Sequence, residues 1–480
     1  MNLTKVLGDV DFPAASREKW QALAEKSLAG TTFEDALVSR TDDGIRIDPI
    51  YERSAEPSFL PRRNPATPWR IVQRVDDPDP HRANRQALED IEQGATGLSL
   101  VFESAPNAFG YGLPAARETL DAALAGIPLN RIHLRIDAHA ASRAVADWLV
   151  AYLTKQRADP ARLSLCFGID PAAIFAGTGR LSMTIEALHA SMPQSLAHFF
   201  ALGVPGVLLE ADGRVFHNAG ATEAQELGAM LASAAAHLRL FEDARQALVY
   251  AAPHIGFAVS VDQDQFLSMA KVRALRKLWA RTLELCSIPP ATAAIHAETS
   301  YRMMTAADPE TNILRSTIAC FAAATGGADS LSILPHTIAN GLPTGFARRI
   351  ARNAQIVMAE ESHIGFVADP SSGSGGVEAL TDALCEKAWD EFRMIESEGG
   401  ILRSLKEGHV QRRIAAARDE RAQQYRDGKR AILGTTLYRV EEHKPVETLA
   451  AAKRPMPTDG AVFCDRLDAV RTDELLGDRP

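Results

Sequence analysis

The stretch Arg131-Ile-His-Leu-Arg-Ile-Asp137 indicates the fold class, because its polar and apolar residues alternate as in a half-buried β-strand. Seven further short runs, apolar, β-branched or alternating, complete a set of eight strand candidates: 97–103, 131–137, 162–168, 206–210, 255–261, 292–296, 330–334 and 364–367. Helical, alanine-rich stretches lie between them, at 141–156, 222–237, 264–286, 310–325 and 344–362. This alternation predicts parallel strands joined by right-handed crossovers, and therefore an α/β protein with a (β/α)8 TIM-type barrel.

Two points about the barrel stay open in the sequence. The run at 364–367 could lie outside the barrel, and residues 171–181 could contain another strand. We expect the barrel to span residues 66–378, preceded by an arm at 1–65 in which a helix at 16–29 is followed by an extended, proline-rich segment. A charged helical extension at 379–440 and a peripheral tail at 441–480 complete the predicted organisation.

Composition narrows the class of protein. The 480 residues carry 52 Lys and Arg against 61 Asp and Glu, a net charge of -9, which argues against binding nucleic acid or an anionic membrane through charge alone. Five widely spaced cysteines form no Cys-x-x-Cys pair and are typical of reduced thiols in the cytoplasm. We find neither a leader-like amino terminus nor ~18 uninterrupted apolar residues, so we expect a cytoplasmic protein that does not span a membrane.

Several clusters could carry chemistry, and each has a simpler structural explanation. Strand alternation places His133, Asp137 and His139 on one face, where they could bind a metal as in a barrel hydrolase, or simply pair with one another inside the barrel. The loop Ser371-Ser-Gly-Ser-Gly-Gly376 could hold a phosphate or only turn the chain into a helix. Two basic clusters could bind phosphate or face solvent, namely Arg348, Arg349 and Arg352, and Lys271, Arg273, Arg276 and Lys277.

Six segments together resemble the adenosylcobalamin-dependent methylmalonyl-CoA mutase family. In chain order these segments are Pro68-Trp-Arg-Ile-Val-Gln73, Gly94-Ala-Thr-Gly-Leu-Ser99, His296-Ala-Glu-Thr-Ser300, Ile318-Ala-Cys-Phe-Ala-Ala-Ala-Thr-Gly-Gly327, Arg349-Ile-Ala-Arg-Asn353 and Asp369-Pro-Ser-Ser-Gly-Ser374. Their order and spacing cover about residues 60–440. The resemblance implies a barrel whose central channel admits an acyl-CoA, with cobalamin held by a separate carboxyl-terminal domain.

Departures from the family pattern bear on catalysis. Where catalytic members carry a tyrosine near the substrate, this chain has Arg74, and where they carry a histidine that hydrogen-bonds the thioester carbonyl, it has Val215, with His217 displaced by two residues. On extended backbone that displacement moves the ring by about 7 Å. Ala294 also replaces an arginine of the family motif. We therefore expect no catalytic residue in this chain.

The cofactor motif of the family, Asp-x-His-x-x-Gly, has only one near match, Asp137-Ala-His139-Ala-Ala-Ser142, which lacks the glycine. About 40 residues follow the shared region, fewer than the ~130 expected of a doubly wound cofactor domain. We expect neither a cofactor site nor a metal site in this chain, and we expect adenosylcobalamin on a partner.

The chain thus resembles the small, non-catalytic subunit of the two-chain mutases, whose larger homologous partner interconverts (R)-methylmalonyl-CoA and succinyl-CoA. Candidates for remaining contacts with the channel or with CoA are His296, Glu298, Arg273, Arg276, Arg349 and Arg352. Two alternatives stay open beside the metal-dependent hydrolase. The chain could be an active barrel that works with a separate cobalamin-binding subunit on another acyl-CoA, or it could be a scaffold or regulatory paralogue.

Overall fold

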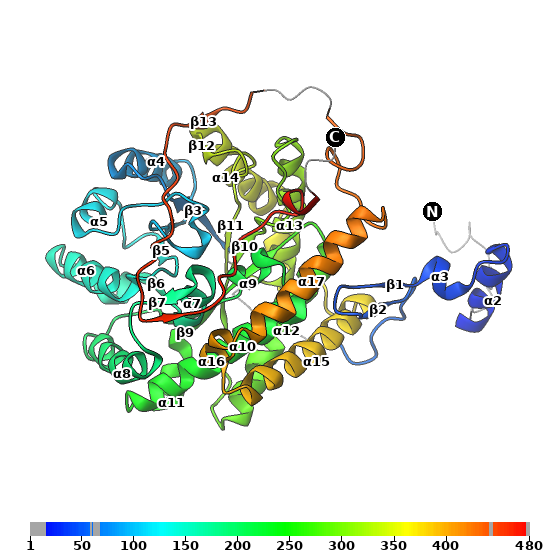
Figure 1. Ribbon diagram of the computed structural model, residues 1–480, viewed down its shortest axis with the longest axis horizontal. Coiled ribbons are helices and arrows are strands. Elements are labelled where there is room, and N and C mark those ends of the chain that lie inside the picture. The colour runs from blue at the N-terminus through cyan, green and yellow to red at the C-terminus, as the bar shows by residue number, and fades with distance from the viewer. Residues whose placement is uncertain (1–15, 58–59, 61–67, 441–444, 477–480) are drawn as a thin grey trace, which may run out of the picture.

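The protein folds around a closed barrel of eight parallel strands in the computed structural model, which describes residues 16–57, 60, 68–440 and 445–476 (Figure 1). In spatial order the strands are β3 Arg70–Val75, β4 Gly97–Leu100, β5 His133–Ile136, β6 Ser164–Ile169, β8 Val207–Asp212, β9 Ile255–Val261, β10 Ala294–Thr299 and β11 Ser330–Ser332. The barrel closes where β11 pairs with β3. The predicted (β/α)8 fold class is therefore confirmed.

Seven of the eight strand candidates lie in this barrel, and the eighth was wrong. Residues Ile364–Phe366 form a 3-10 helix, whose Phe366 and following Val367 are exposed, so this apolar run pairs with no strand. The strand missing from the prediction is β3. Its Gln73 and Arg74 are buried although they are polar, and the apolar pattern therefore did not reveal it. Residues 171–181 contain α7 Pro171–Thr178 and the short strand β7 Arg180–Leu181 outside the barrel.

Helices surround the barrel and begin where capping residues predict. Asp79, Thr222, Asp264 and Thr344 each accept a backbone N–H in the first turn of the helix that follows, and Thr222 forms a capping box with Gln225. The helices that follow barrel strands are α4 Pro80–Glu92, α5 Arg117–Ala123, α6 Ser142–Lys155, α8 Ile185–Ala201, α9 Arg214–Ala219, α10 Glu223–Asp243, α11 Leu248–Ala251, α12 Gln265–Leu285, α13 Thr311–Gly326 and α14 Gly345–Ile356.

A carboxyl-terminal layer of helices packs against the outside of the barrel. It consists of α15 Gly375–Ser397, α16 Ile401–Lys406 and α17 His409–Arg426, and α15 lies against α10 and α12. The predicted boundary at residue 378 falls inside α15. The helix is amphipathic, with Leu384 and Ala388 fully buried in the main hydrophobic core.

The amino-terminal arm contacts the body through its hairpin and through the segment that follows the hairpin. Helices α2 Arg17–Ser27 and α3 Phe33–Leu37 bury no residue and lie apart from the barrel (Figure 1). They lead into a hairpin of β1 Ser39–Arg40 and β2 Arg46–Ile47. At the turn of this hairpin, Asp42 pairs with Arg421 of α17 at 2.7 Å and Ile45 is buried. Within the predicted arm, residues 1–15, 58–59 and 61–65 lie outside the described residues.

The carboxyl-terminal tail runs across loops at the carboxyl-terminal ends of the strands (Figure 1). Its short strand β13 Thr448–Leu449 pairs with β12 Leu342–Pro343, and β14 Val462–Phe463 pairs with β7. Within the described ranges we find no helix with the length and apolar character needed to cross a membrane.

Candidate functional site

The interior of the barrel is filled by charged side chains that are almost completely buried. Three arginines and five carboxylates from four of the eight strands and the segments just beyond them meet there: Arg74, Arg135, Arg214, Asp76, Asp137, Asp212, Glu210 and Glu298. In each of these ion pairs both side chains are at most 3% exposed. A buried charge is tolerated only when it is paired and hydrogen-bonded, so these residues depend on one another.

Arg74, which the sequence resemblance aligns with the family's tyrosine, is buried in the interior of the barrel. Its guanidinium donates to Glu298 at 2.8 Å, to Asp76 at 3.2 Å and to the backbone oxygen of Asn107 at 2.7 Å. It also lies 5.4 Å from the ring centre of Phe109, a cation–π distance. The residue that replaces the tyrosine therefore connects three sides of the interior.

Arg214 holds a second group of carboxylates below the barrel mouth. It donates to Asp212 at 2.7 Å and 2.9 Å, to Asp137 at 3.1 Å and to Glu298 at 3.1 Å. Burial alone would raise the pKa of Asp137, but Arg214 and Arg135 hold it well below its usual range. For Asp212, burial outweighs the pairing with Arg214 and raises its pKa to about 6.

The histidines of the interior do not converge on a metal position. His133 lies beside the hydroxyl of Ser164 at 2.9 Å, whereas the ring of His139 stacks on Phe102 at 4.7 Å. Asp137, between them in sequence, is bound by arginines. Burial lowers the pKa of both histidines to about 3, so they are neutral at pH 7. The geometry does not assemble the ligand set of the metal-dependent hydrolase.

We expect His139→Phe to remove part of the acid sensitivity of the fold. The pKa of His139 is about 3 when folded and about 6.5 when unfolded, so below pH 6.5 the unfolded chain takes up a proton that the folded chain does not. Protonation of His139 in the unfolded chain should therefore lower the free energy of unfolding by about 1.4 kcal/mol for each unit by which the pH falls from 6.5 to 3.

His133 has the same lowered pKa and keeps its own contribution, so the loss of stability between pH 7.5 and 5.5, measured by urea unfolding, should be about 1.4 kcal/mol smaller in His139→Phe than in the unaltered chain. The control is His189→Gln on the exposed side of α8, which should leave this loss unchanged. An unaltered loss in His139→Phe would show that this ring does not resist protonation.

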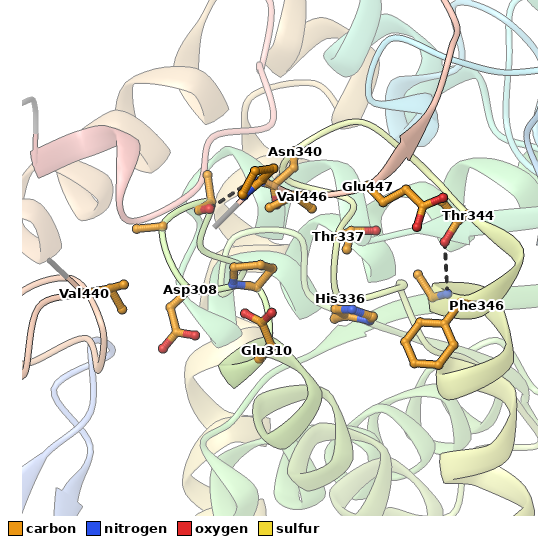
Figure 2. A pocket seen from close by; sticks show the side chains of 15 residues that line it. Asp308, Glu310, His336, Thr337, Asn340, Thr344, Phe346, Val440, Val446 and Glu447 are labelled. Carbon is orange, nitrogen blue, oxygen red and sulfur yellow. Dashed lines mark hydrogen bonds between the residues drawn. The ribbon is translucent and has the colours of Figure 1, made fainter. Parts of the chain in front are cut away.

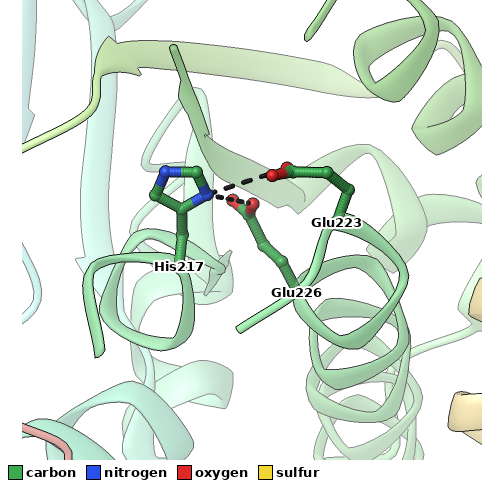
Figure 3. A group of neighbouring side chains, drawn as sticks. All are labelled: His217, Glu223 and Glu226. Carbon is green, nitrogen blue, oxygen red and sulfur yellow. Dashed lines mark hydrogen bonds and ion pairs between the residues drawn. The ribbon is translucent and has the colours of Figure 1, made fainter. Parts of the chain in front are cut away.

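The displaced histidine, His217, belongs to a separate buried cluster with Glu223 and Glu226 (Figure 3). Its Nδ1 lies 3.1 Å from Glu226, and its Nε2 lies 2.8 Å from the hydroxyl of Ser300. Possible ligand atoms of the three residues lie within 4.8 Å of one another, a spacing that could suit a metal. However, the ammonium group of Lys271 contacts both carboxylates, at 2.7 Å for Glu226, and so already supplies the positive charge. A metal would have to displace this lysine.

Val215 does not face the barrel interior as the family's histidine would need to. It is 3% exposed on α9 and packs in a second hydrophobic cluster that also contains Phe216 and Leu405. A Cβ on Gly177 would lie only 3.0 Å from it, so there is little free space. The neighbouring His217 uses both ring nitrogens in the cluster described above.

The six candidate contact residues do not form one site. His296 and Glu298 are buried in β10 on the interior face, and Nδ1 of His296 lies 2.9 Å from the hydroxyl of Ser330. Contact of these two residues with CoA stays a prediction. Ala294, at the position of the family's arginine, is exposed at the start of β10.

The four candidate arginines lie on outer helices. On α12, Arg273 pairs with Glu378 at 2.9 Å and Arg276 with Asp329 at 2.9 Å. On α14, Arg352 pairs with Asp90 at 2.6 Å, while Arg349 is exposed. Carboxylates elsewhere in the chain therefore hold three of these guanidinium groups, and the sequence clusters reflect ion pairs between layers rather than one phosphate site.

The glycine-rich loop at 371–376 is a contact surface for the arm. A Cβ on Gly375 would lie 1.7 Å from the backbone oxygen of Glu52, and one on Gly376 would lie 3.3 Å from the ring of Tyr51. The N–H of Ser54 donates to the oxygen of Gly373 at 3.2 Å. These glycines permit the close approach of the arm, which explains the loop without a bound phosphate.

The tail covers the carboxyl-terminal mouth of the barrel. Its N–H groups donate to the segments that follow four strands, at the backbone oxygens of Gly110, Ala176 of α7, Asn218 of α9 and Arg302, over 2.8–2.9 Å. Beneath the tail, Phe109 stacks on Tyr301 with ring centres 4.1 Å apart. Arg471 of the tail donates a hydrogen bond to the hydroxyl of Tyr301 at 3.2 Å. The aromatic pair therefore contacts two arginines, Arg74 at Phe109 and Arg471 at Tyr301.

These contacts do not fit a cobalamin held by His139. Its Nε2 has no hydrogen-bond partner among the described residues, which would leave an atom for cobalt. The residue is nevertheless only 1% exposed, so a cobalt atom could reach this nitrogen only if the side chains around it were displaced.

Fold and interior together define a (β/α)8-barrel protein whose interior is closed by ion pairs. Residues 51–473 match the family model for methylmalonyl-CoA mutase. A methylmalonyl-CoA mutase small subunit of Streptomyces virginiae is 37% identical over 468 residues, which cover 93% of this chain and 74% of the relative. The small subunit of Propionibacterium freudenreichii is 33% identical over 470 residues, 91% of this chain and 71% of the relative. The chain belongs to the methylmalonyl-CoA mutase family.

Proposed function

We propose that this chain is the small, non-catalytic subunit of an adenosylcobalamin-dependent methylmalonyl-CoA mutase and acts in the cytoplasm. In this proposal a larger homologous chain holds the cofactor and interconverts (R)-methylmalonyl-CoA and succinyl-CoA. The two relatives described above carry the name of small subunits, which supports the assignment.

The observation that carries the proposal is the charged interior. By the family resemblance, an active member admits the acyl-CoA through its barrel. Here Arg74, Arg214 and Glu298 bridge that space, and all are at most 4% exposed. An acyl-CoA chain would have to separate these ion pairs without replacing them, which costs several kcal/mol for each uncompensated charge.

The covered mouth supports placing the cofactor on the partner. The tail and the Phe109–Tyr301 pair occupy the end of the barrel at which TIM-barrel enzymes carry out their chemistry. An adenosylcobalamin approaching that end would meet Arg471 and the tail backbone first.

The role that remains is to bind and support the catalytic chain. Radical chemistry needs a closed cavity with little water, and a rigid partner can hold an active barrel closed. The arm suits this role, because α2 and α3 pack Trp20 against Phe33 with ring centres 5.9 Å apart but leave Leu23 68% exposed. Because these two helices bury no side chain within the described chain, their surfaces are available for a partner to cover.

Purification under native conditions, with the partner identified by mass, tests the proposal. The expected result is a larger homologue that contains Asp-x-His-x-x-Gly and carries the bound cobalamin. A partner that binds cobalamin but has no barrel of its own would favour the alternative, an active barrel in this chain. Recovery of the chain with unrelated proteins only would favour a scaffold or regulatory paralogue.

We expect deletion of residues 1–37 to abolish copurification with the large chain while the barrel stays folded. The deletion removes α2 and α3, which bury no residue, and keeps the hairpin turn with Asp42 and Ile45. Affinity copurification measures the first effect and thermal unfolding the second.

A point variant that tests the same surface is Leu23→Ser, which changes one exposed apolar residue of α2 and should weaken the complex without altering the melting temperature. A complex of unchanged stability after the deletion would contradict a role of the arm in binding the partner.

A further inference from the structure

A large pocket lies at the rim of the barrel, away from the charged interior (Figure 2). Its volume is about 760 Å³, and it is formed by the loops after β10 and β11, the start of α14 and two parts of the tail. These are the seventh and eighth strands of the barrel, where TIM barrels frequently bind phosphate. This pocket has the opposite charge.

Carboxylates dominate the charge of the pocket. Asp308, Glu310 and Glu447 line it, and no lysine or arginine is among its described lining residues. Asp308 accepts the N–H of Thr311 at 3.3 Å at the start of α13. Glu310 and Glu447 are exposed, with no ion-pair partner among the described residues. The ends of two helices supply only about half a positive charge each, so the described lining of the pocket stays negative.

Two polar atoms in the pocket are buried without a partner. Thr337 is 6% exposed, and its hydroxyl has no hydrogen-bond partner in the described part of the chain. The Nδ1 atom of His336 is also buried and also lacks a partner there. Burial lowers the pKa of His336, which leaves the ring neutral and able to accept a hydrogen bond at one nitrogen. A buried polar atom without a hydrogen-bond partner destabilises the fold. A ligand that donates hydrogen bonds would give partners to the Thr337 hydroxyl and to Nδ1 of His336.

The spacing of the acidic groups disfavours a metal ion. A divalent cation needs several oxygen ligands about 2.0–2.6 Å from one point. Among the described residues, only His217, Glu223 and Glu226 bring three such atoms within 4.8 Å, and none of them lines this pocket. The walls between the carboxylates are apolar, with Phe346 66% exposed and alanine, proline and valine side chains beside it.

We propose that this pocket binds an aliphatic polyamine, a ligand with ammonium groups spaced along a methylene chain. Ammonium groups only donate hydrogen bonds and carry positive charge, as the carboxylates, Thr337 and His336 require. The methylene groups would lie against the apolar walls, and an ammonium group can stack over the ring of Phe346.

Calorimetric titration of the purified chain with spermidine at low ionic strength tests the proposal. We expect saturable binding to one site that weakens as salt is raised. The double variant Glu310→Gln/Glu447→Gln should bind about tenfold more weakly, because each substitution removes one exposed ion pair. Thr337→Val should weaken binding about fivefold through the lost acceptor.

The matched control is Asp147→Asn/Glu242→Gln, which makes the same change in net charge at exposed positions of α6 and α10. It should bind spermidine as the unaltered chain does. Equal weakening in the control, or no saturable binding to the unaltered chain, would overturn the proposal. Binding that is lost in the complex with the large chain would also overturn it, since the pocket would then be an interface filled by the partner.

Discussion

Replacing Arg74 by methionine should destabilise the chain by about 3 kcal/mol, because removal of one member of a buried ion-pair network leaves its partners with uncompensated charge. Methionine keeps most of the volume but supplies no donor for Glu298, Asp76 or the backbone oxygen of Asn107. Glu298 keeps Arg214 and Asp76 keeps Arg348, so we expect a value at the lower end of the usual range.

Urea unfolding at pH 7.5 measures this effect. Arg349→Met on the exposed side of α14 is the matched control and should change the free energy of unfolding by less than about 0.5 kcal/mol. If Arg74→Met were no more destabilising than the control, the barrel interior would not depend on these ion pairs, and the argument for a closed barrel would fail.

The second large effect concerns catalysis. We expect no mutase activity from the isolated chain, even after two side chains of the family pattern are restored. The isolated chain supplied with adenosylcobalamin and methylmalonyl-CoA should form no succinyl-CoA, and neither should Arg74→Tyr/Val215→His. A tyrosine at 74 leaves Glu298 and Asp76 without one of their arginines, and a histidine at 215 enters the hydrophobic cluster beside Gly177. Residues that act as a unit give grossly non-additive effects, so restoring two of them does not restore the unit.

The assay is conversion of methylmalonyl-CoA with the large chain absent, and a complex that contains the large chain is the positive control. Circular dichroism of the double variant separates loss of folding from lack of activity. Measurable conversion by the isolated chain, or by the folded double variant, would show that this barrel retains a working site.

The alternating runs predicted the barrel because successive side chains of a strand lie on opposite faces, so that in β5 Leu134 and Ile136 join the hydrophobic core while Arg135 joins the charged interior. The same logic failed at Arg70–Val75, where the buried Arg74 lies on the inner face and the equally buried Gln73 lies on the outer face, donating to Asp90 of α4. It also failed at Ile364–Phe366, where an apolar run forms a 3-10 helix with Phe366 exposed. A local pattern does not reveal whether a distant carboxylate will pair with a buried arginine.

The candidate site was harder to predict for the same reason. Alternation placed Arg135 and Asp137 on one face, but their partners Glu210 and Arg214 come from β8 and α9, more than 70 residues away. Closure and register of the barrel decide which charges meet. Lys271 belonged to a basic sequence cluster, yet its helix turns it inward between Glu223 and Glu226.

The central claim is that this barrel does not admit an acyl-CoA, and calorimetric titration of the isolated, folded chain with succinyl-CoA tests it most directly. The charged network that includes Arg74, Arg214 and Glu298 predicts no saturable binding. Binding of one succinyl-CoA per chain, with an affinity that Glu298→Gln changes at least tenfold while Glu242→Gln leaves it unaltered, would contradict the claim.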